Sequence, residues 1–189
     1  MSDALDGLAG DESVSAVVLT GRGDTFTAGF DLDEFDRLDD EVFAAELWAS
    51  SDRFHRVCLS FPLPLLAAVN GPALAGGFDL AVMCDLRVVS STAWFSHPEL
   101  RFSEVVYGPL HELVGGAAAR DLALTGRRGR RGRGDTTGSR HAGRRTRCRR
   151  RRSRGAGGRI AASPWSVLAR MKRKIVARAG VVGERTLDL

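Results

Sequence analysis

The chain has 189 residues, enough for one domain with a hydrophobic core. Its formal charge of +5 is unevenly distributed. Residues 127–159 hold 15 of the 28 Lys and Arg residues and one of the 23 acidic residues, so they carry +14 and the remainder carries −9. The basic total therefore reflects one segment and does not by itself indicate a nucleic-acid-binding fold. There is no apolar run long enough to cross a bilayer and no signal-peptide pattern, so we expect a cytoplasmic protein without a membrane partner.

The chain begins with patterns typical of alternating strands and helices. A β-branched run at 14–19 (VSAVVL) predicts a buried strand, and a glycine-rich loop follows it. Apolar residues at helical spacing predict an amphipathic helix over 40–60, which Pro62 and Pro64 end. Residues 65–69 (LLAAV) predict a second buried strand.

The same alternation continues to Gly126. We predict a tight turn in NGPALAGG, then a short apolar helix over 76–84, a strand at 86–89 and a brief strand at 94–95. A helix is expected over 110–124. Strands that alternate with helices indicate an α/β core.

Residues 127–159 break this pattern. Their apolar side chains are Ala142, Cys148 and Ala156, so the segment cannot bury enough surface to offset its ordering entropy. We expect a disordered tract between a core at 1–126 and a helical segment at 160–189. In that last segment, Ser163 is expected to cap a helix whose first residue is Pro164.

The cysteines Cys58, Cys84 and Cys148 lack the spacing of metal ligands, and we predict no metal site. Cys58 and Cys84 stand among apolar residues. We therefore expect both to be buried free thiols, as in a reducing compartment.

Three motifs in order resemble the crotonase (enoyl-CoA hydratase/isomerase) superfamily. They are AVVLTGRGDTFTAGFDLDEF (16–35), PLPLLAAVNGPALAGGFDLAVMCDLRVVS (62–90) and FSHPELRFSEVVYGPL (95–110), and the likeness resumes at RIAASPWSVLARMKRK. The resemblance implies a repeated ββα superhelix core, incomplete here, with a C-terminal helix. It also implies an acyl-CoA substrate, no further cofactor, and a homotrimer or hexamer. The family's opening strands would lie upstream, so we expect Met1 to be an internal start.

The resemblance assigns an oxyanion hole to two backbone amides. Acyl-CoA chemistry passes through an enolate-like anion, which N–H donors in a water-poor site stabilise. The matching amides are those of Phe30 and Gly76, although the family commonly has a small residue where Phe30 stands. The alternative is that Phe30 is a core residue and Gly76 a turn glycine.

The resemblance also assigns Glu99 and Asp79 as the carboxylates of general acid–base catalysis. Asp79 is one methylene shorter than the family's usual glutamate, which leaves hydratase and isomerase open. The alternatives are a first-turn helix acid for Asp79 and a surface acid for Glu99. His97 and His111 are interpreted as surface or pocket-wall residues without a catalytic partner. The remaining substrate-binding positions implied are Ala28, Asp31, Leu32, Leu74 and Pro98.

The arginine tract is best interpreted as a segment read in a shifted frame. Moving each codon by one base turns Arg before Arg (CGN-C) into GNC, which encodes Val, Ala, Asp or Gly. Residues 137–147 then permit LGLVTRVVEPD, which matches the family's pattern at this place, and the other shifted frame permits no aliphatic core. With this segment lost, we expect weak folding and little activity from the chain as written. The alternative is a non-catalytic protein that binds nucleic acid through the tract. The tract has no aromatic residue to stack on bases, so we expect no specific nucleic-acid partner.

Overall fold

The computed structural model describes residues 1–101, 105–129 and 155–179. Its larger sheet has three parallel strands, with β2 (Leu65–Val69) between β1 (Val17–Thr20) and β4 (Leu86–Val89). Val17 lies opposite Leu65, and Ala67 of β2 lies opposite Arg87 of β4. Every residue of β2 is buried, as the run LLAAV predicted. This strand therefore forms the centre of the core.

β1 differs from the fully buried strand that the sequence predicted. Its residues alternate between partly buried and exposed positions, and Val18 is 37% exposed. Val17 and Leu19 pack against the core. Successive side chains of a strand point to opposite faces of the sheet, so the face of β1 that carries Val18 stays outside the core.

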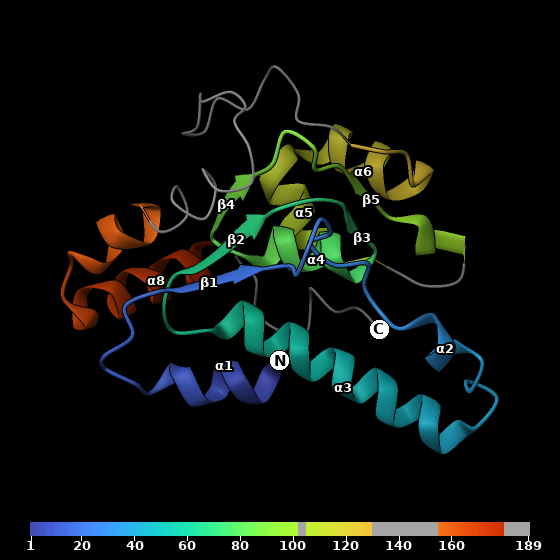
Figure 1. Ribbon diagram of the computed structural model, residues 1–189, viewed down its shortest axis with the longest axis horizontal. Helices are drawn as coiled ribbons and strands as arrows, with labels where there is room; N and C mark the ends of the chain where they lie inside the picture. The colour runs from blue at the N-terminus through green and yellow to red at the C-terminus, as the bar shows by residue number, and fades with distance from the viewer. Residues whose placement is uncertain (102–104, 130–154, 180–189) are drawn as a thin grey trace.

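The long helix α3 (Glu41–Ser60) confirms the amphipathic helix predicted over 40–60. The Asp40 carboxylate caps it by accepting hydrogen bonds from the backbone N–H groups of Val42 and Phe43, at 3.0 and 3.2 Å. α1 (Ser2–Ala9) lies beside α3 on one side of the sheet (Figure 1).

The segment after β2 is more structured than a tight turn. It contains β3 (Ala73–Leu74), which pairs in parallel with β5 (Phe95–Ser96), and it leads directly into α4 (Gly76–Met83). The 3-10 helix η1 (Pro98–Arg101) follows β5. The second sheet thus brings the start of α4 beside the start of η1.

The single helix predicted over 110–124 is two helices, α5 (Tyr107–Val114) and α6 (Gly116–Thr125). Gly115 separates them with φ of +80°, which glycine adopts without steric penalty. The helical spacing of apolar residues on both sides hides this break in the sequence.

Both ends of the arginine tract differ from the expected disorder. Phe95 and Gly129 exchange two backbone hydrogen bonds, at 2.9 and 2.7 Å, which need no apolar side chain. Residues 155–161 are helical, and Ala156 and Ile160 in this segment are partly buried. Residues 130–154, including Cys148, lie outside the described part of the chain. The expectation for them stays a prediction.

α8 (Trp165–Ala179) begins one residue later than predicted. The Pro164 carbonyl accepts hydrogen bonds from the N–H groups of Val167 and Leu168, so Pro164 precedes the first helical residue.

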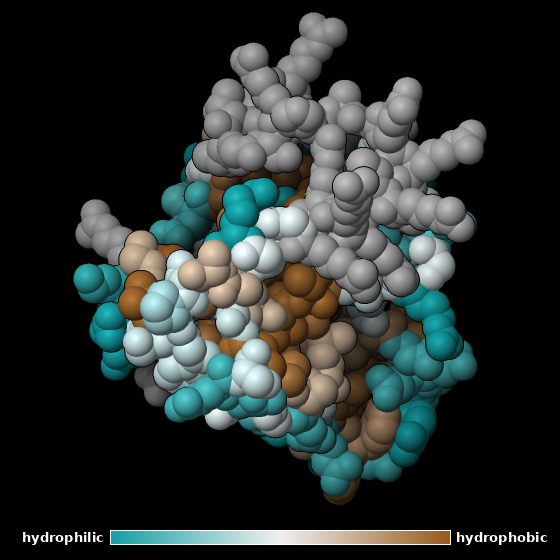
Figure 2. All heavy atoms as spheres, turned by 60° about the vertical axis from the view of Figure 1, so that its left-hand side comes forward, coloured by the Kyte–Doolittle hydropathy of each residue, from teal (hydrophilic) through white to brown (hydrophobic). Residues whose placement is uncertain are grey.

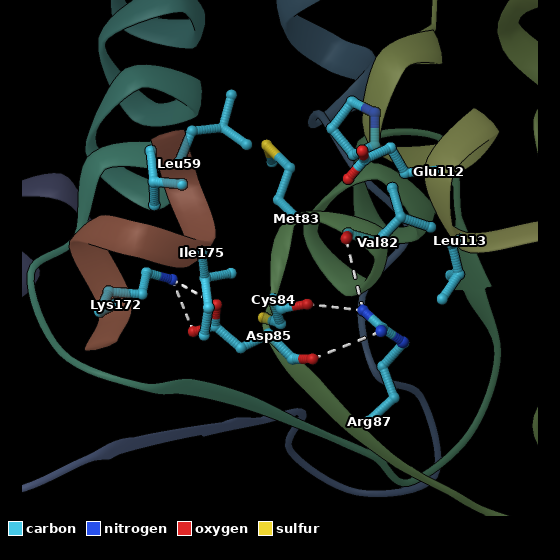
Figure 3. A pocket seen from close by; sticks show the side chains of 12 residues that line it. Leu59, Val82, Met83, Cys84, Asp85, Arg87, Glu112, Leu113, Lys172 and Ile175 are labelled. Atoms are coloured by element: carbon cyan, nitrogen blue, oxygen red, sulfur yellow. Dashed lines mark hydrogen bonds and ion pairs between the residues drawn. The ribbon is translucent and has the colours of Figure 1, made fainter. Parts of the chain in front are cut away.

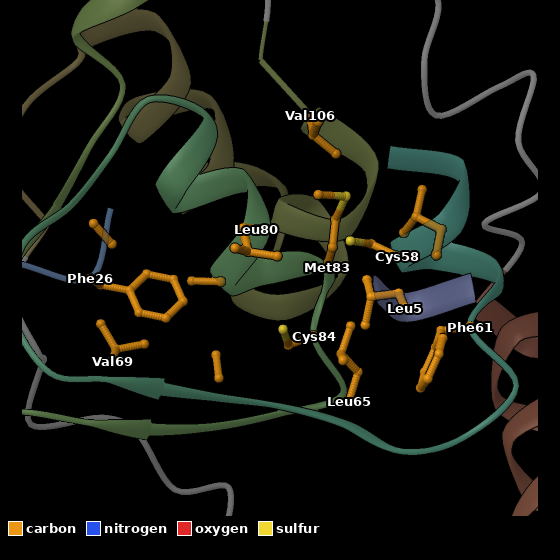
Figure 4. Packing of buried hydrophobic residues seen from close by; sticks show 14 of the residues in the cluster. Leu5, Phe26, Cys58, Phe61, Leu65, Val69, Leu80, Met83, Cys84 and Val106 are labelled. Carbon is orange, nitrogen blue, oxygen red and sulfur yellow. The ribbon is translucent and has the colours of Figure 1, made fainter. Parts of the chain in front are cut away.

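The main core lies between the larger sheet and the helices α1, α3 and α4 (Figure 4). Cys58 and Cys84 are buried within it as free thiols, as predicted. Each fully buried leucine there contributes about 1.5–3 kcal/mol of hydrophobic stabilisation. No helix among the described residues is long and apolar enough to span a membrane. The core includes Leu5, Phe26, Phe61, Leu63, Leu65, Val69, Leu80 and Met83.

Candidate active site

The loop at 27–30 packs closely against the turn that begins α4. The Thr27 carbonyl accepts a hydrogen bond from the Leu74 N–H at 3.0 Å. A Cβ on Gly77 would lie 2.3 Å from the Thr27 carbonyl oxygen, and a Cβ on Gly29 would lie 3.0 Å from the Gly76 nitrogen. Gly29 also has φ of +93°. Glycines at both positions therefore bring the backbone before Phe30 against the first residue of α4.

Ala75, directly before Gly76, adopts φ of +50° and ψ of −133°. This conformation is uncommon for a residue with a Cβ and costs on the order of 1–3 kcal/mol. The surroundings hold it in place: the Ala75 N–H donates to the Ser96 carbonyl at 3.0 Å, and its carbonyl accepts from Phe78 and Asp79. Within the described residues, neither the Phe30 nor the Gly76 N–H donates a backbone hydrogen bond. Two donors thus remain available where the loop meets the helix.

The Phe30 side chain joins an aromatic cluster. Its ring centroid lies 5.7 Å from that of Phe35, in the short helix α2 (Leu32–Phe35), and 5.8 Å from that of Trp48 in α3, both edge-to-face. The alternative that Phe30 is a packing residue therefore holds for its ring. Its backbone N–H takes no part in that packing and can still donate a hydrogen bond.

Asp79, His97 and Glu99 form a buried cluster, with exposed fractions of 5%, 1% and 6%. His97 Nδ1 lies 2.9 Å from Glu99 Oε1, a hydrogen-bond distance, and 3.8 Å from Asp79 Oδ1. The structure thus brings the two predicted carboxylates together. The surface-acid alternative for Glu99 is wrong, because η1 turns its side chain inward.

His97 is the site residue that the sequence interpretation missed. We expected a surface or pocket-wall residue without a catalytic partner, and instead it lies between the two carboxylates. Its ring stacks on Phe78 at 4.4 Å between centroids with 24° between planes. The available signal was its spacing, two residues before Glu99 with Pro98 between. His111 is exposed on α5, as expected.

Burial dominates the electrostatics of Asp79. The pKa of this carboxyl is raised from 3.8 to about 7, because burial and, less strongly, the nearby Glu99 raise it by more than a charged His97 and the Val106 N–H lower it. The Val106 N–H donates to Asp79 Oδ1 at 3.2 Å. Asp79 can therefore exchange a proton near neutral pH, as acid–base catalysis requires. It also stands in the first turn of α4, so the helix-dipole alternative fits its position as well.

The same cluster offers the donor set of a metal site. One donor atom from each of Asp79, His97 and Glu99 lies within 4.8 Å of the others, and an imidazole with two carboxylates suits zinc and similar divalent ions. The contact between His97 and Glu99 is nevertheless of hydrogen-bond length and needs no ion to explain it.

The other predicted binding residues lie in or next to the 27–30 loop, in β3 before α4, and at the start of η1. Asp31 caps α2 by accepting a hydrogen bond from Asp33 N–H at 3.2 Å, and Leu32 is 71% exposed. Leu74 belongs to β3. Ala28 and Pro98 are exposed, in the 27–30 loop and at the start of η1.

A separate hollow of about 250 Å³ lies between the end of α4, α5 and α8 (Figure 3). Three of the charged residues that line it serve the fold: Arg87 donates to the Cys84 carbonyl at 2.6 Å, and Lys172 pairs with Asp85. None of Asp79, His97 or Glu99 lines it. The acid cluster, rather than this hollow, is therefore the candidate active site.

Comparisons with known proteins show the family to which the chain belongs. The model of the family "Enoyl-CoA hydratase/isomerase" matches residues 1–131. A Thermus thermophilus protein assigned to the enoyl-CoA hydratases is 47% identical over 131 residues, 66% of this chain and 51% of the relative. A Rhizobium meliloti protein with the same assignment is 39% identical over 133 residues, 66% of this chain and 49% of the relative.

The chain thus spans about half the length of these curated relatives. Among solved structures, an enoyl-CoA hydratase subunit from Geobacillus kaustophilus superposes with a TM-score of 0.78 at 29% identity, over 99% of this chain and 73% of that one. The expected crotonase fold is therefore confirmed. The chain belongs to the enoyl-CoA hydratase/isomerase family of the crotonase superfamily.

Proposed function

We propose that this site processes an acyl-CoA thioester by hydration or double-bond isomerisation of an enoyl-CoA. One observation carries the proposal: α4 presents the Gly76 amide at its start and the buried Asp79 carboxyl one turn later, beside Glu99. A single short helix thus supplies an anion-binding donor and a proton-exchanging group. The family membership and the enoyl-CoA hydratases among its relatives support this reading.

In the proposed reaction, the Phe30 and Gly76 amides bind the thioester oxygen and stabilise the enolate that develops there. Glu99 removes or delivers the proton at carbon, and Asp79 is the second carboxylate. The CoA thioester is the substrate, and this chemistry needs no metal or redox cofactor. Ala28, Asp31, Leu32, Leu74 and Pro98 are proposed as substrate-binding residues.

The two reactions differ in what they ask of Asp79. Hydration needs both carboxylates to hold and activate a water molecule, whereas isomerisation can use Glu99 alone to move one proton. Asp79 is short, but its proton exchanges near neutral pH. Product analysis separates the two outcomes, because hydration gives a hydroxyacyl-CoA and isomerisation keeps the composition of the substrate.

Proton exchange at the α-carbon of a short acyl-CoA in D₂O tests the proposal. Exchange accumulates over hours, so it reveals even the weak activity expected of the chain as written. We expect slow exchange with the parent chain and its loss in Glu99→Gln. Glu46→Gln, at an exposed position of α3, is the matched control and should exchange as the parent does. Exchange that is unaffected by Glu99→Gln would contradict the proposal.

We also propose that α8 supports self-association, as a homotrimer or hexamer. Val167, Met171 and Ile175 stand four residues apart on one face of α8 and are 42%, 55% and 45% exposed. Figure 2 turns this side of the molecule forward and shows hydrophobic side chains at its surface. Light scattering should give a multiple of the chain mass, and Met171→Glu should lower it. A monomer in both proteins would contradict association through this face.

The buried thiols fit a cytoplasmic, reducing location.

A further inference from the structure

His97 is held rigidly between the two carboxylates of the candidate active site. Its ring lies flat against Phe78, which fixes the ring plane, and the Ala75 N–H binds the carbonyl of the preceding residue, Ser96. The side chain has no measurable exposed surface. The position of Nδ1 relative to Glu99 is therefore set by packing from α4 and β5.

The hydrogen bond between His97 and Glu99 fixes where protons stand. When Glu99 is ionised its carboxylate can only accept, so in that state Nδ1 carries the hydrogen and donates to Glu99 Oε1. His97 Nε2 and Glu99 Oε2 are both buried and have no hydrogen-bond partner among the described residues. A buried polar atom without a hydrogen bond costs about 1–3 kcal/mol. These two atoms are therefore positions where a ligand or a water molecule would form hydrogen bonds.

The ring also lies between two acids that compete for protons. Among the described residues, the charged groups facing it are Asp79 from α4 and Glu99 from η1, and Phe78 covers its face with an aromatic ring. A positive His97 favours the ionised form of Asp79, whereas the negative Glu99 opposes it. The charges of His97 and Glu99 therefore act in opposite directions on the proton of Asp79.

We propose that His97 is a positioning residue for the proposed acid–base reaction: it orients Glu99 through Nδ1–H and holds an ionisable ring beside the Asp79 carboxyl. It acts through Asp79 and Glu99 and makes no bond to the substrate. This inference rests on the proposed function, and it adds a third titratable residue to the two carboxylates.

Three variants separate the contributions of His97. His97→Asn retains an N–H donor close to the position of Nδ1 but cannot carry a charge. His97→Phe retains the stacking on Phe78 and removes both nitrogens. His111→Asn changes an exposed histidine on α5 and is the matched control.

The first measurement is NMR on the full ¹⁵N- and ¹³C-labelled chain, which needs no turnover. We expect a proton on His97 Nδ1 that is hydrogen-bonded to Glu99, and a weaker hydrogen bond in Glu99→Gln, where a neutral amide oxygen replaces the carboxylate. The titration of the Asp79 carboxyl should move to higher pH in His97→Asn and His97→Phe, because both remove the imidazole whose positive form favours ionised Asp79. It should stay unchanged in His111→Asn. An unchanged Asp79 titration in His97→Phe, with the fold intact by circular dichroism, would overturn the proposal.

The second measurement is the α-proton exchange described above. We expect roughly a tenfold or greater loss in His97→Phe and partial rescue in His97→Asn, with an altered pH profile in both. Absence of exchange in the parent overturns the proposed function, whereas the NMR result decides the coupling of His97 separately. Stoichiometric zinc binding by the parent that His97→Phe abolishes would replace the proposal with a metal site.

Discussion

The Nζ atom of Lys172 lies 2.5 and 2.6 Å from the two carboxylate oxygens of Asp85. The same carboxylate accepts the Leu65 N–H at 2.8 Å, so the pair ties α8 to the start of β2. Lys172 is 4% exposed and follows the arginine tract, whereas Asp85 precedes it. The helix after the tract therefore packs on the core through a specific contact.

We predict that Lys172→Met destabilises the chain, because it leaves Asp85 without its counter-charge in a largely buried place. The free energy of unfolding should fall by about 3 kcal/mol in urea titrations. Lys174→Met, an exposed lysine of the same helix, should change it by less than about 0.5 kcal/mol. If both substitutions changed the free energy of unfolding by the same small amount, the ion pair between Lys172 and Asp85 would not be needed for stability.

Asp79→Asn is expected to stabilise the chain above neutral pH. The pKa of Asp79 is raised in the folded state from 3.8 to about 7, so the native state binds the proton more tightly than the unfolded state does. Stability from this group is present below pH of about 4 and is lost as pH rises to about 7. The variant should be more stable than the parent by about 1–3 kcal/mol at pH of about 8, and this gain should shrink toward pH of about 4. A gain that does not vary with pH would refute the linkage.

The thiols of Cys58 and Cys84 should be inert in the native chain. Burial raises the pKa of each to about 12, so neither forms a thiolate near neutral pH. In a Cys148→Ser background, Ellman's reagent at mildly alkaline pH should label no thiol natively and both in denaturing urea. Fast native labelling would show that this part of the core opens.

The close contact between the 27–30 loop and α4 predicts opposite effects for two glycine substitutions. Gly77→Ala forces a Cβ to within 2.3 Å of the Thr27 carbonyl oxygen and should cost more than about 2 kcal/mol. Gly7→Ala, in α1 with open space around it, should stabilise by about 0.5–1 kcal/mol. Thermal denaturation of both variants checks the prediction, and a neutral Gly77→Ala would contradict it.

The nucleotide sequence across codons 127–159 tests the frameshift interpretation. Read one base out of step, it should encode the aliphatic pattern LGLVTRVVEPD in place of residues 137–147. A chain with that frame restored should unfold at a higher temperature and exchange the α-proton faster than the chain as written. Absence of the aliphatic pattern from the shifted frame would reject the interpretation.

The sequence by itself determined the elements whose signals are local. The buried strand β2, the amphipathic helix α3 and the burial of Cys58 and Cys84 all follow from periodicity and neighbours. The ordered motifs also identified the family. They assigned Glu99 and Asp79 before the structure brought them together.

Only the tertiary structure decided what depends on segments distant in sequence. His97 is buried because Phe78 covers it, and Lys172 is buried because Asp85 neutralises it. Gly129 pairs with Phe95, although Gly129 belongs to a segment that composition alone marks as unable to fold. Each outcome rests on a partner supplied by packing, and the free energy of burying a polar group is set by that partner rather than by the residue itself.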